Sequence, residues 1–176
     1  MTKKIVIIMA VILVCSFSAY GADYKIGHLD LQRLVAESDA GKHAHEQYMA
    51  RTKKYQDEIN VRSDKLKALK EAIEDGAKKL KKGDKVPQSL MDKDRDYAAQ
   101  ARELQRLLGS YQEELKVYDA ELGRKVLDEF TPVLNDYAKK NDYDYIFGRL
   151  DVFAFATEKH DLTNILIKEF NARWNK

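Results

Sequence analysis

The sequence predicts an α+β protein, mainly α, in which a long antiparallel helical hairpin projects from a small head that contains β-strands. Three observations support this fold: two stretches repeat apolar residues every seven positions, a turn-forming segment separates them, and the pattern changes at both ends. A seven-residue repeat with a narrow apolar stripe is typical of a coiled-coil seam. The charged content of 34% also favours long helices with solvated faces over a compact globule.

The first 21 residues have the pattern of a cleavable export signal. Lys3 and Lys4 precede an apolar run of ten residues, Ile5 to Val14, and small or polar residues follow up to Gly21. The run is shorter than the roughly 20 apolar residues that a spanning helix needs, although an uncleaved anchor is the alternative interpretation. We therefore expect residues 1–21 to be a signal peptide and the mature protein to be exported.

Export changes both the charge and the thiol content of the protein. Loss of Lys3 and Lys4 lowers the Lys and Arg count from 31 to 29, which equals the 29 Asp and Glu, and Cys15 is lost as well. A neutral chain has no overall field to attract nucleic acid, so we expect no nucleic-acid partner. A chain without thiols excludes disulfides, thiolate-bound metals and cysteine nucleophiles.

The N-terminal part of the head is expected over residues 22–41. It begins with a short strand around Ile26 and Leu29 and continues into one or two helical turns in LQRLVAES. Gly41 then indicates a break in the helix, because glycine is a poor helix former. The first helix of the arm is expected to start near Lys42.

The arm is expected over residues 42–141, and each of its two helices carries interleaved apolar series with a seven-residue step. The first helix has Ile59, Leu66, Ile73 and Leu80, and a second series of Tyr48, Tyr55 and Leu69 that Arg62 and Gly76 interrupt. The second helix has Tyr97, Leu104, Tyr111 and Tyr118, together with Ala101, Leu108, Leu115 and Leu122. Such seams need a partner, and the nearest is the other helix of the same chain.

The segment KKLKKGDKVPQS supplies the turn between the two helices. Gly83-Asp84 and Val86-Pro87 are turn and helix-start residues, so the tip of the hairpin is expected near residues 83–88. One continuous helix is the alternative, which these turn residues disfavour.

The seam changes direction near the end of the second helix. Beyond Leu122 the apolar positions step to Val126 and Phe130, which indicates that the helix meets a different neighbour there. Thr131 and Pro132 predict either a restarted helix or a kink at this point.

The C-terminal part of the head is expected over residues 142–176. The partial alternation of 142–147 and the apolar run 152–156 predict a hairpin or two neighbouring strands. Asp161 is expected to cap a final amphipathic helix that ends near Trp174.

A head of this size cannot bury a sufficient core without cysteines or metal, so we expect it to oligomerise. The candidate residues for this oligomerisation are Ile26, Leu29, Ile146, Phe147, Phe153 and Phe155.

Three stretches resemble the Skp (OmpH-like) family of periplasmic outer-membrane-protein chaperones. They are KIGHLDLQRLVAESDAGK, PVLNDYAKKNDYDYIF and HDLTNILIKEFN, and their order along the whole mature chain is that of the family. The resemblance implies a homotrimer with a β-barrel-like body, whose helical hairpins surround a cavity that holds unfolded outer-membrane proteins without ATP. The best-known members are strongly basic, whereas this mature chain is neutral, so no lipopolysaccharide site is carried over.

Two sets of arm residues are candidates for contact with such client proteins. The lysines of the tip are Lys78, Lys79, Lys81, Lys82 and Lys85; the alternative is a charged loop that is only solvated. The tyrosines are Tyr48, Tyr55, Tyr97, Tyr111 and Tyr118; the alternative is that they only fill the seam.

The sequence holds no constellation typical of an enzyme. The pair His43 and His45 is spaced so that the rings leave a helix on different faces, which is poor for a shared metal ion. No glycine-rich phosphate-binding loop is present. We therefore expect an ATP-independent holdase with no catalytic residue, metal or cofactor; the alternative is a structural coiled-coil spacer that binds one folded partner.

Overall fold

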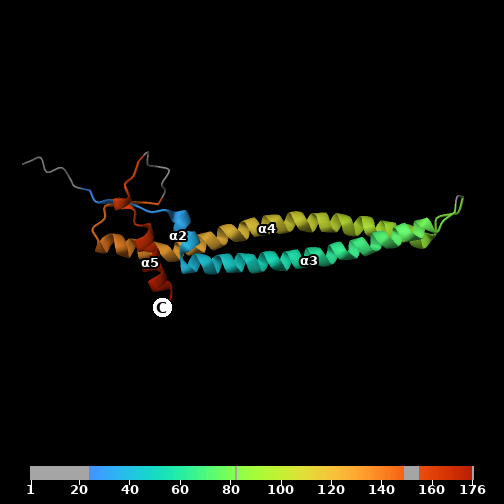
Figure 1. The fold of residues 1–176 in the computed structure, drawn as a ribbon, viewed down its shortest axis with the longest axis horizontal. Helices are drawn as coiled ribbons and strands as arrows, with labels where there is room; N and C mark the ends of the chain where they lie inside the picture. The colour runs from blue at the N-terminus through green and yellow to red at the C-terminus, as the bar shows by residue number, and fades with distance from the viewer. Residues whose placement is uncertain (1–23, 82, 149–154, 176) are drawn as a thin grey trace, which may run out of the picture.

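The computed structural model describes residues 24–81, 83–148 and 155–175 of the chain. Helix α3 (Asp39–Lys78) and helix α4 (Gln88–Lys140) run side by side in opposite directions and form the long arm (Figure 1). The connection between them lies at the far end of the arm from the head. The predicted α+β fold, mainly α with a helical hairpin, is confirmed. The predicted signal peptide, Lys82 and Phe153 lie outside the described residues.

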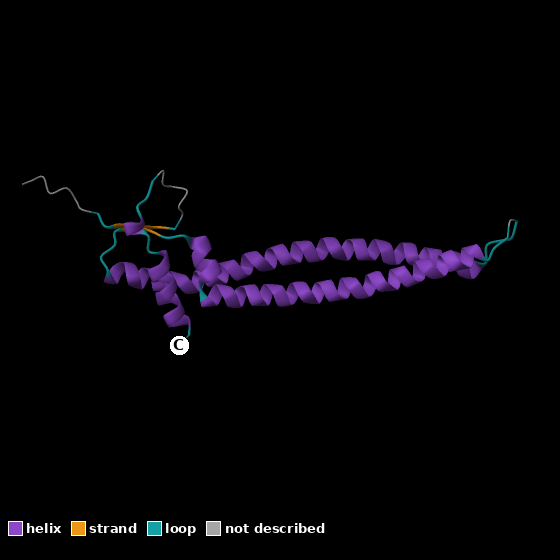
Figure 2. Ribbon diagram, viewed as in Figure 1, coloured by secondary structure: helices purple, strands orange, loops and turns teal. Residues whose placement is uncertain are grey.

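The head gathers the short elements from both ends of the chain, as Figure 2 shows. They are β1 (Ile26–His28), α2 (Leu31–Glu37), β2 (Tyr145–Phe147), the 3-10 helix η2 (Glu158–His160) and α5 (Thr163–Trp174). None of the helices within the described ranges combines the length and the apolar character that crossing a membrane requires.

The two described strands pair in parallel, with Gly27 opposite Ile146 in the register. The amide of Leu29 continues the ladder by donating to the carbonyl of Phe147 at 2.9 Å. The parallel pairing is possible because the whole arm serves as the crossover connection between β1 and β2. β2 thus pairs with β1, a pairing that the sequence did not predict. Residues 152–154 of the other predicted strand lie outside the described residues, and Phe155 and Ala156 lie in no strand.

The break that the sequence indicated at Gly41 is wrong, because Gly41 lies in the first turn of α3. The chain breaks instead at Ser38, whose hydroxyl accepts a hydrogen bond from the amide of Gly41 at 3.1 Å. A Cβ on Gly41 would lie 1.5 Å from the carbonyl oxygen of Val35, so the glycine permits the close approach of α2 to α3. Glycine is required here by packing and not by a helix end.

The core of the head forms where α4 and α5 cross. The rings of Phe130 and Phe170 meet edge to face with centroids 5.5 Å apart, and Leu34 and Leu166 are fully buried beside them. The predicted change of neighbour near the end of the second arm helix is thus confirmed. The same packing places the end of α4 in the core of the head, inside the range 42–141 that was assigned to the arm.

Helix α4 continues through Pro132 to Lys140, so the predicted restart of the helix is wrong. The hydroxyl of Thr131 donates to the carbonyl of Leu127 at 2.8 Å and does not cap a new helix. The buried side chains of Phe130 and Val133 hold this stretch against the core, which offsets the loss of one backbone hydrogen bond at the proline.

The last helix starts two residues after the predicted cap, Asp161. Leu162 occupies the cap position of α5, and the carboxylate of Asp161 accepts a hydrogen bond from the amide of Thr163 at 2.8 Å. Asp161 therefore accepts the hydrogen bond of the first amide of α5, but it lies one position before the N-cap and not at the N-cap as predicted.

Candidate interaction surfaces

Tyrosines from both helices bind across the seam of the arm. The rings of Tyr55 and Tyr111 stack with centroids 4.1 Å apart and planes 3° from parallel. The hydroxyl of Tyr55 donates to the carboxylate of Glu114 at 2.6 Å, which raises the pKa of Tyr55 and lowers that of Glu114. Tyr111, next to Glu58 on the opposite helix, likewise lowers the pKa of that carboxylate. These two rings form one layer of contacts between α3 and α4 in the seam.

A second layer lies nearer the head. The guanidinium of Arg51 lies 3.7 Å from the ring centroid of Tyr118, and the hydroxyl of Tyr118 donates to Gln47 at 3.4 Å. Tyr48 and Tyr97 are half-buried on the same seam. All five tyrosines thus lie in the seam, and contact with another molecule by their exposed parts stays a prediction.

The seam is only partly shielded from water. Of the described residues from Lys42 to Glu121, none is fully buried. Two helices alone cannot surround a side chain, so each seam residue keeps an exposed edge. The arm therefore presents apolar surface along its length without a core of its own.

Several large apolar side chains of the arm are more exposed than the seam residues. Leu108 belongs to the apolar series with a seven-residue step, yet it is 38% exposed, whereas its neighbour Leu107 is half-buried. Leu108 therefore does not fill the seam as its position in the series predicted. The other exposed apolar residues of the two arm helices are Met49, Val61, Met91 and Val117.

The connection at the tip spans residues 79–87 and turns at Gly83, whose φ is +101°. Asp84 stabilises the turn because its carboxylate accepts a hydrogen bond from the amide of Lys81 at 2.8 Å. Lys79, Lys81 and Lys85 are exposed around it, and Lys78 forms an exposed ion pair with Asp75. The described lysines of the tip are accessible, and their contact with a client protein stays a prediction.

The sheet of the head presents aromatic and aliphatic side chains to solvent. Tyr24 and Tyr145 meet edge to face at 5.8 Å, and Ile26 and Phe147 are exposed on the same two-stranded sheet. Phe155 is 82% exposed. We call Tyr24, Ile26, Tyr145, Phe147 and Phe155 the head patch.

Two candidates for oligomerisation have a different environment. Leu29 is 1% exposed and belongs to the core of its own protomer, so it is not available to a second copy. Ile146 is half-buried and packs against the same core.

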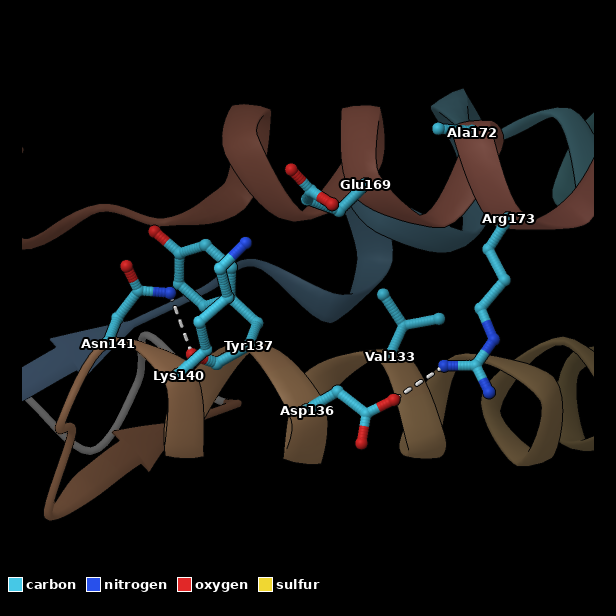
Figure 3. Close-up of a pocket in the computed structure, with 8 residues that line it drawn as sticks. All are labelled: Val133, Asp136, Tyr137, Lys140, Asn141, Glu169, Ala172 and Arg173. Carbon is cyan, nitrogen blue, oxygen red and sulfur yellow. Dashed lines mark hydrogen bonds and ion pairs between the residues drawn. The ribbon is translucent and has the colours of Figure 1, made fainter.

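A hollow of about 600 Å³ opens between the end of α4 and α5, and Figure 3 shows the side chains around it. Asp136 and Arg173 form an ion pair across it at 2.7 Å. Burial, with Tyr143 and Glu169 nearby, raises the pKa of Tyr137 in its wall. No pattern in the sequence indicates this hollow, because its residues come from two separate helices, α4 and α5.

The described residues contain no group of three His, Cys, Asp or Glu side chains that could hold a metal ion. The ion pair in the hollow is not accompanied by a nucleophile and a base in hydrogen-bond contact, which covalent catalysis would need.

Comparison with known proteins supports the same fold. The crystal structure of an OmpH-like protein from Caulobacter crescentus, described as a proposed outer membrane chaperone, superposes with a TM-score of 0.74. The superposition covers 87% of each chain at 16% sequence identity, which shows a shared fold.

No protein with curated function matches the chain by sequence. A sequence model of the family described as outer membrane protein (OmpH-like) matches residues 25–170. The chain therefore belongs to the OmpH-like outer membrane protein family.

Proposed function

We propose that the protein is an ATP-independent holdase that binds unfolded outer-membrane proteins between the helical arms of several copies. The observation that carries this proposal is an arm without a fully buried side chain among the described residues from Lys42 to Glu121. Such an arm offers weak apolar contacts over a great length. Membership of the OmpH-like family and the fold shared with the Caulobacter protein support the same assignment.

Assembly would turn these weak contacts into retention of the client. We propose that the head, residues 22–41 and 142–176 with the end of α4, associates through the head patch into a homotrimer. Several arms held around one cavity raise the effective concentration of contact sites for any segment of a client. Because each contact is weak, the client can rearrange and leave for a better binding site without nucleotide hydrolysis. The protein thus acts by binding and not by catalysis.

The proposal includes the cellular location. The N-terminal pattern of Lys3, Lys4 and the apolar run of ten residues supports export to the periplasm with removal of a signal peptide. Mass spectrometry of the protein recovered from periplasmic extract would give the first residue of the mature chain, which we expect to be Ala22.

The function is tested by diluting an unfolded outer-membrane β-barrel protein out of denaturant in the presence of the purified protein. We expect aggregation, followed by light scattering, to be suppressed at a small molar excess of the intact oligomer. Full aggregation beside an intact oligomer would contradict the proposal. A single folded partner recovered in equal amounts, without any effect on unfolded proteins, would instead support a structural spacer.

The tip lysines allow a second test of the proposed function. Changing Lys78, Lys79, Lys81, Lys82 and Lys85 to Gln should weaken capture of an acidic client and flatten its salt dependence, because exposed charges act over about 8 Å at physiological salt. A matched change of five exposed lysines of α3 away from the tip should leave the salt dependence closer to that of the original protein; these are Lys53, Lys54, Lys65, Lys67 and Lys70. Equal effects of the two sets would mean that the tip lysines only keep the loop solvated.

A further inference from the structure

One side of α4 is free of charge over the middle of the arm. Steps of three and four residues place a set of side chains on one face of a helix. The residues that follow these steps are Ala98, Ala101, Gln105, Leu108, Gln112 and Leu115. We call them the uncharged ridge. A ridge of this length without a charge stands out in a chain that is 34% charged.

The other flank of the seam carries the charges. Glu114 accepts from Tyr55 there, and Arg51 lies over Tyr118. Glu113 and Glu121 line a hollow of about 360 Å³ on the same flank. Its carboxylates and guanidinium would cost free energy to desolvate under an apolar ligand. The two flanks of the arm are thus chemically different.

Helix α3 continues the uncharged ridge on its own side of the seam. Met49, Gln56 and Ser63 recur at seven residues and are all exposed, and the exposed Lys53 is the charged side chain at the outer edge of this row. Residues two positions apart on an α-helix point about 200° away from each other. Met49 therefore points away from Arg51, and Gln56 points away from Glu58. They therefore belong to the flank opposite the charged one, beside the uncharged ridge of α4.

The uncharged ridge also holds apolar surface that the hairpin leaves open. Leu108 is 38% exposed, and Met49, on the continuation of the ridge in α3, is 51% exposed. Gln105 and Gln112 are exposed between the apolar positions. Their amides can donate to and accept from the backbone of a bound chain.

We infer that the uncharged ridge is the surface with which each arm contacts an extended apolar segment of an unfolded polypeptide. From Ala98 to Leu115 it is about 26 Å long, which matches about eight residues of extended chain. Alternating apolar segments of this length are what membrane β-strands consist of. The inference rests on the proposed function and names the surface that performs it.

The size of the uncharged ridge excludes a second arm as its stable occupant. At a width of about 10 Å, the ridge offers roughly 260 Å² per copy. Two such surfaces together bury about 500 Å², well below the roughly 1,200 Å² of a stable protein–protein interface. A short, exchangeable peptide contact fits this area.

The first test compares two exposed apolar residues on opposite flanks of α4. Leu108→Gln should raise the concentration needed for half-maximal suppression of aggregation about fivefold, because a contact that every arm repeats is weakened. Val117→Gln is the matched control, since Val117 is 50% exposed on the charged flank, and it should change little. Equal changes in both variants, with oligomer mass and melting temperature preserved, would overturn the inference.

The second test does not depend on the holdase activity. With Cys15 replaced by serine, Gln112→Cys on the uncharged ridge and Glu113→Cys on the charged flank are each labelled with a benzophenone. The probe is a ten-residue peptide of alternating leucine and serine. It should crosslink several-fold more at position 112 than at position 113.

Equal or weaker crosslinking at 112 would overturn the inference, even in a protein that holds unfolded clients. Preferential crosslinking at 112 by a protein that fails to suppress aggregation would leave the ridge as a peptide site and contradict the proposed function alone.

Discussion

At the scale of single residues, Tyr55 and Tyr111 show how the arm is held together without a buried core. The two rings stack on each other, and Tyr55 donates a hydrogen bond to Glu114 of the opposite helix, while Glu58 raises the pKa of Tyr111. The seven-residue steps were enough to predict that both tyrosines lie in the seam. They could not predict the glutamates, because Glu58 and Glu114 lie outside the apolar series and only the register of the hairpin brings them to the tyrosines.

The bond between Tyr55 and Glu114 predicts a pH dependence of stability. The hydrogen bond from Tyr55 lowers the pKa of Glu114 below its value in the unfolded chain. The stabilisation is therefore complete above the unfolded pKa of about 4.3 and is lost as the pH falls through the folded pKa. Tyr55→Phe should lower the melting temperature at neutral pH, and the difference from the original protein should shrink in acid. Thermal unfolding followed by circular dichroism measures this.

Tyr118→Phe is the control for that experiment. The hydroxyl of Tyr118 contacts Gln47, which has no charge to titrate. Its effect on the melting temperature should therefore be nearly the same at neutral and acidic pH. A loss of stability from Tyr55→Phe that stays constant across the acidic range would show that the bond to Glu114 contributes nothing.

At the scale of elements, the helices were predictable and their junctions were not. The long apolar series located α3, α4 and α5 in sequence. Gly41 was interpreted as a helix break from its low helix propensity, whereas it lies inside α3 under the carbonyl of Val35. Leu108 was assigned to the seam from its step, whereas its side chain is 38% exposed. Both errors come from contacts between helices, which a pattern within one helix cannot reveal.

The glycines of the long helices predict opposite effects of the same substitution. Gly41→Ala should lower the free energy of unfolding by at least about 1–3 kcal/mol, because the new methyl group meets backbone that cannot move aside. Gly109→Ala should raise it by about 1 kcal/mol, because no atom lies within 4 Å of the new Cβ and alanine favours the helix. Denaturant titration of both variants gives the two values. A loss of stability from Gly109→Ala would mean that the exposed middle of α4 does not behave as a regular helix.

At the scale of the whole molecule, the arm depends on a head that joins the two ends of the chain. The amide of Lys25 donates to Asp144 at 2.7 Å, and these residues are 119 positions apart. The sequence predicted both strand regions and the need of the small head for a partner. The parallel pairing of β1 with β2 could not be predicted, because strands of three residues carry too little pattern to select a neighbour.

The head patch predicts that association through the sheet is needed for function. Replacing Ile26 and Tyr145 with Asp places charges on exposed apolar positions, so the fold of the protomer should survive while the proposed oligomer dissociates. Light scattering coupled to size-exclusion chromatography should then give the mass of a monomer of 20.3 kDa or, after export, slightly less. Suppression of aggregation should fall with it, because single arms lose the gain from multivalent contact.

Val61→Asp is the matched control, since Val61 is 55% exposed on the arm and remote from the head. It adds the same kind of charge and should leave the mass of the oligomer unchanged. The same mass for the original protein and the head variant would show that copies do not associate through the sheet. A dissociated head variant that still protects unfolded proteins at the original concentration would show that one arm is sufficient, and the cavity would then have no part in the mechanism.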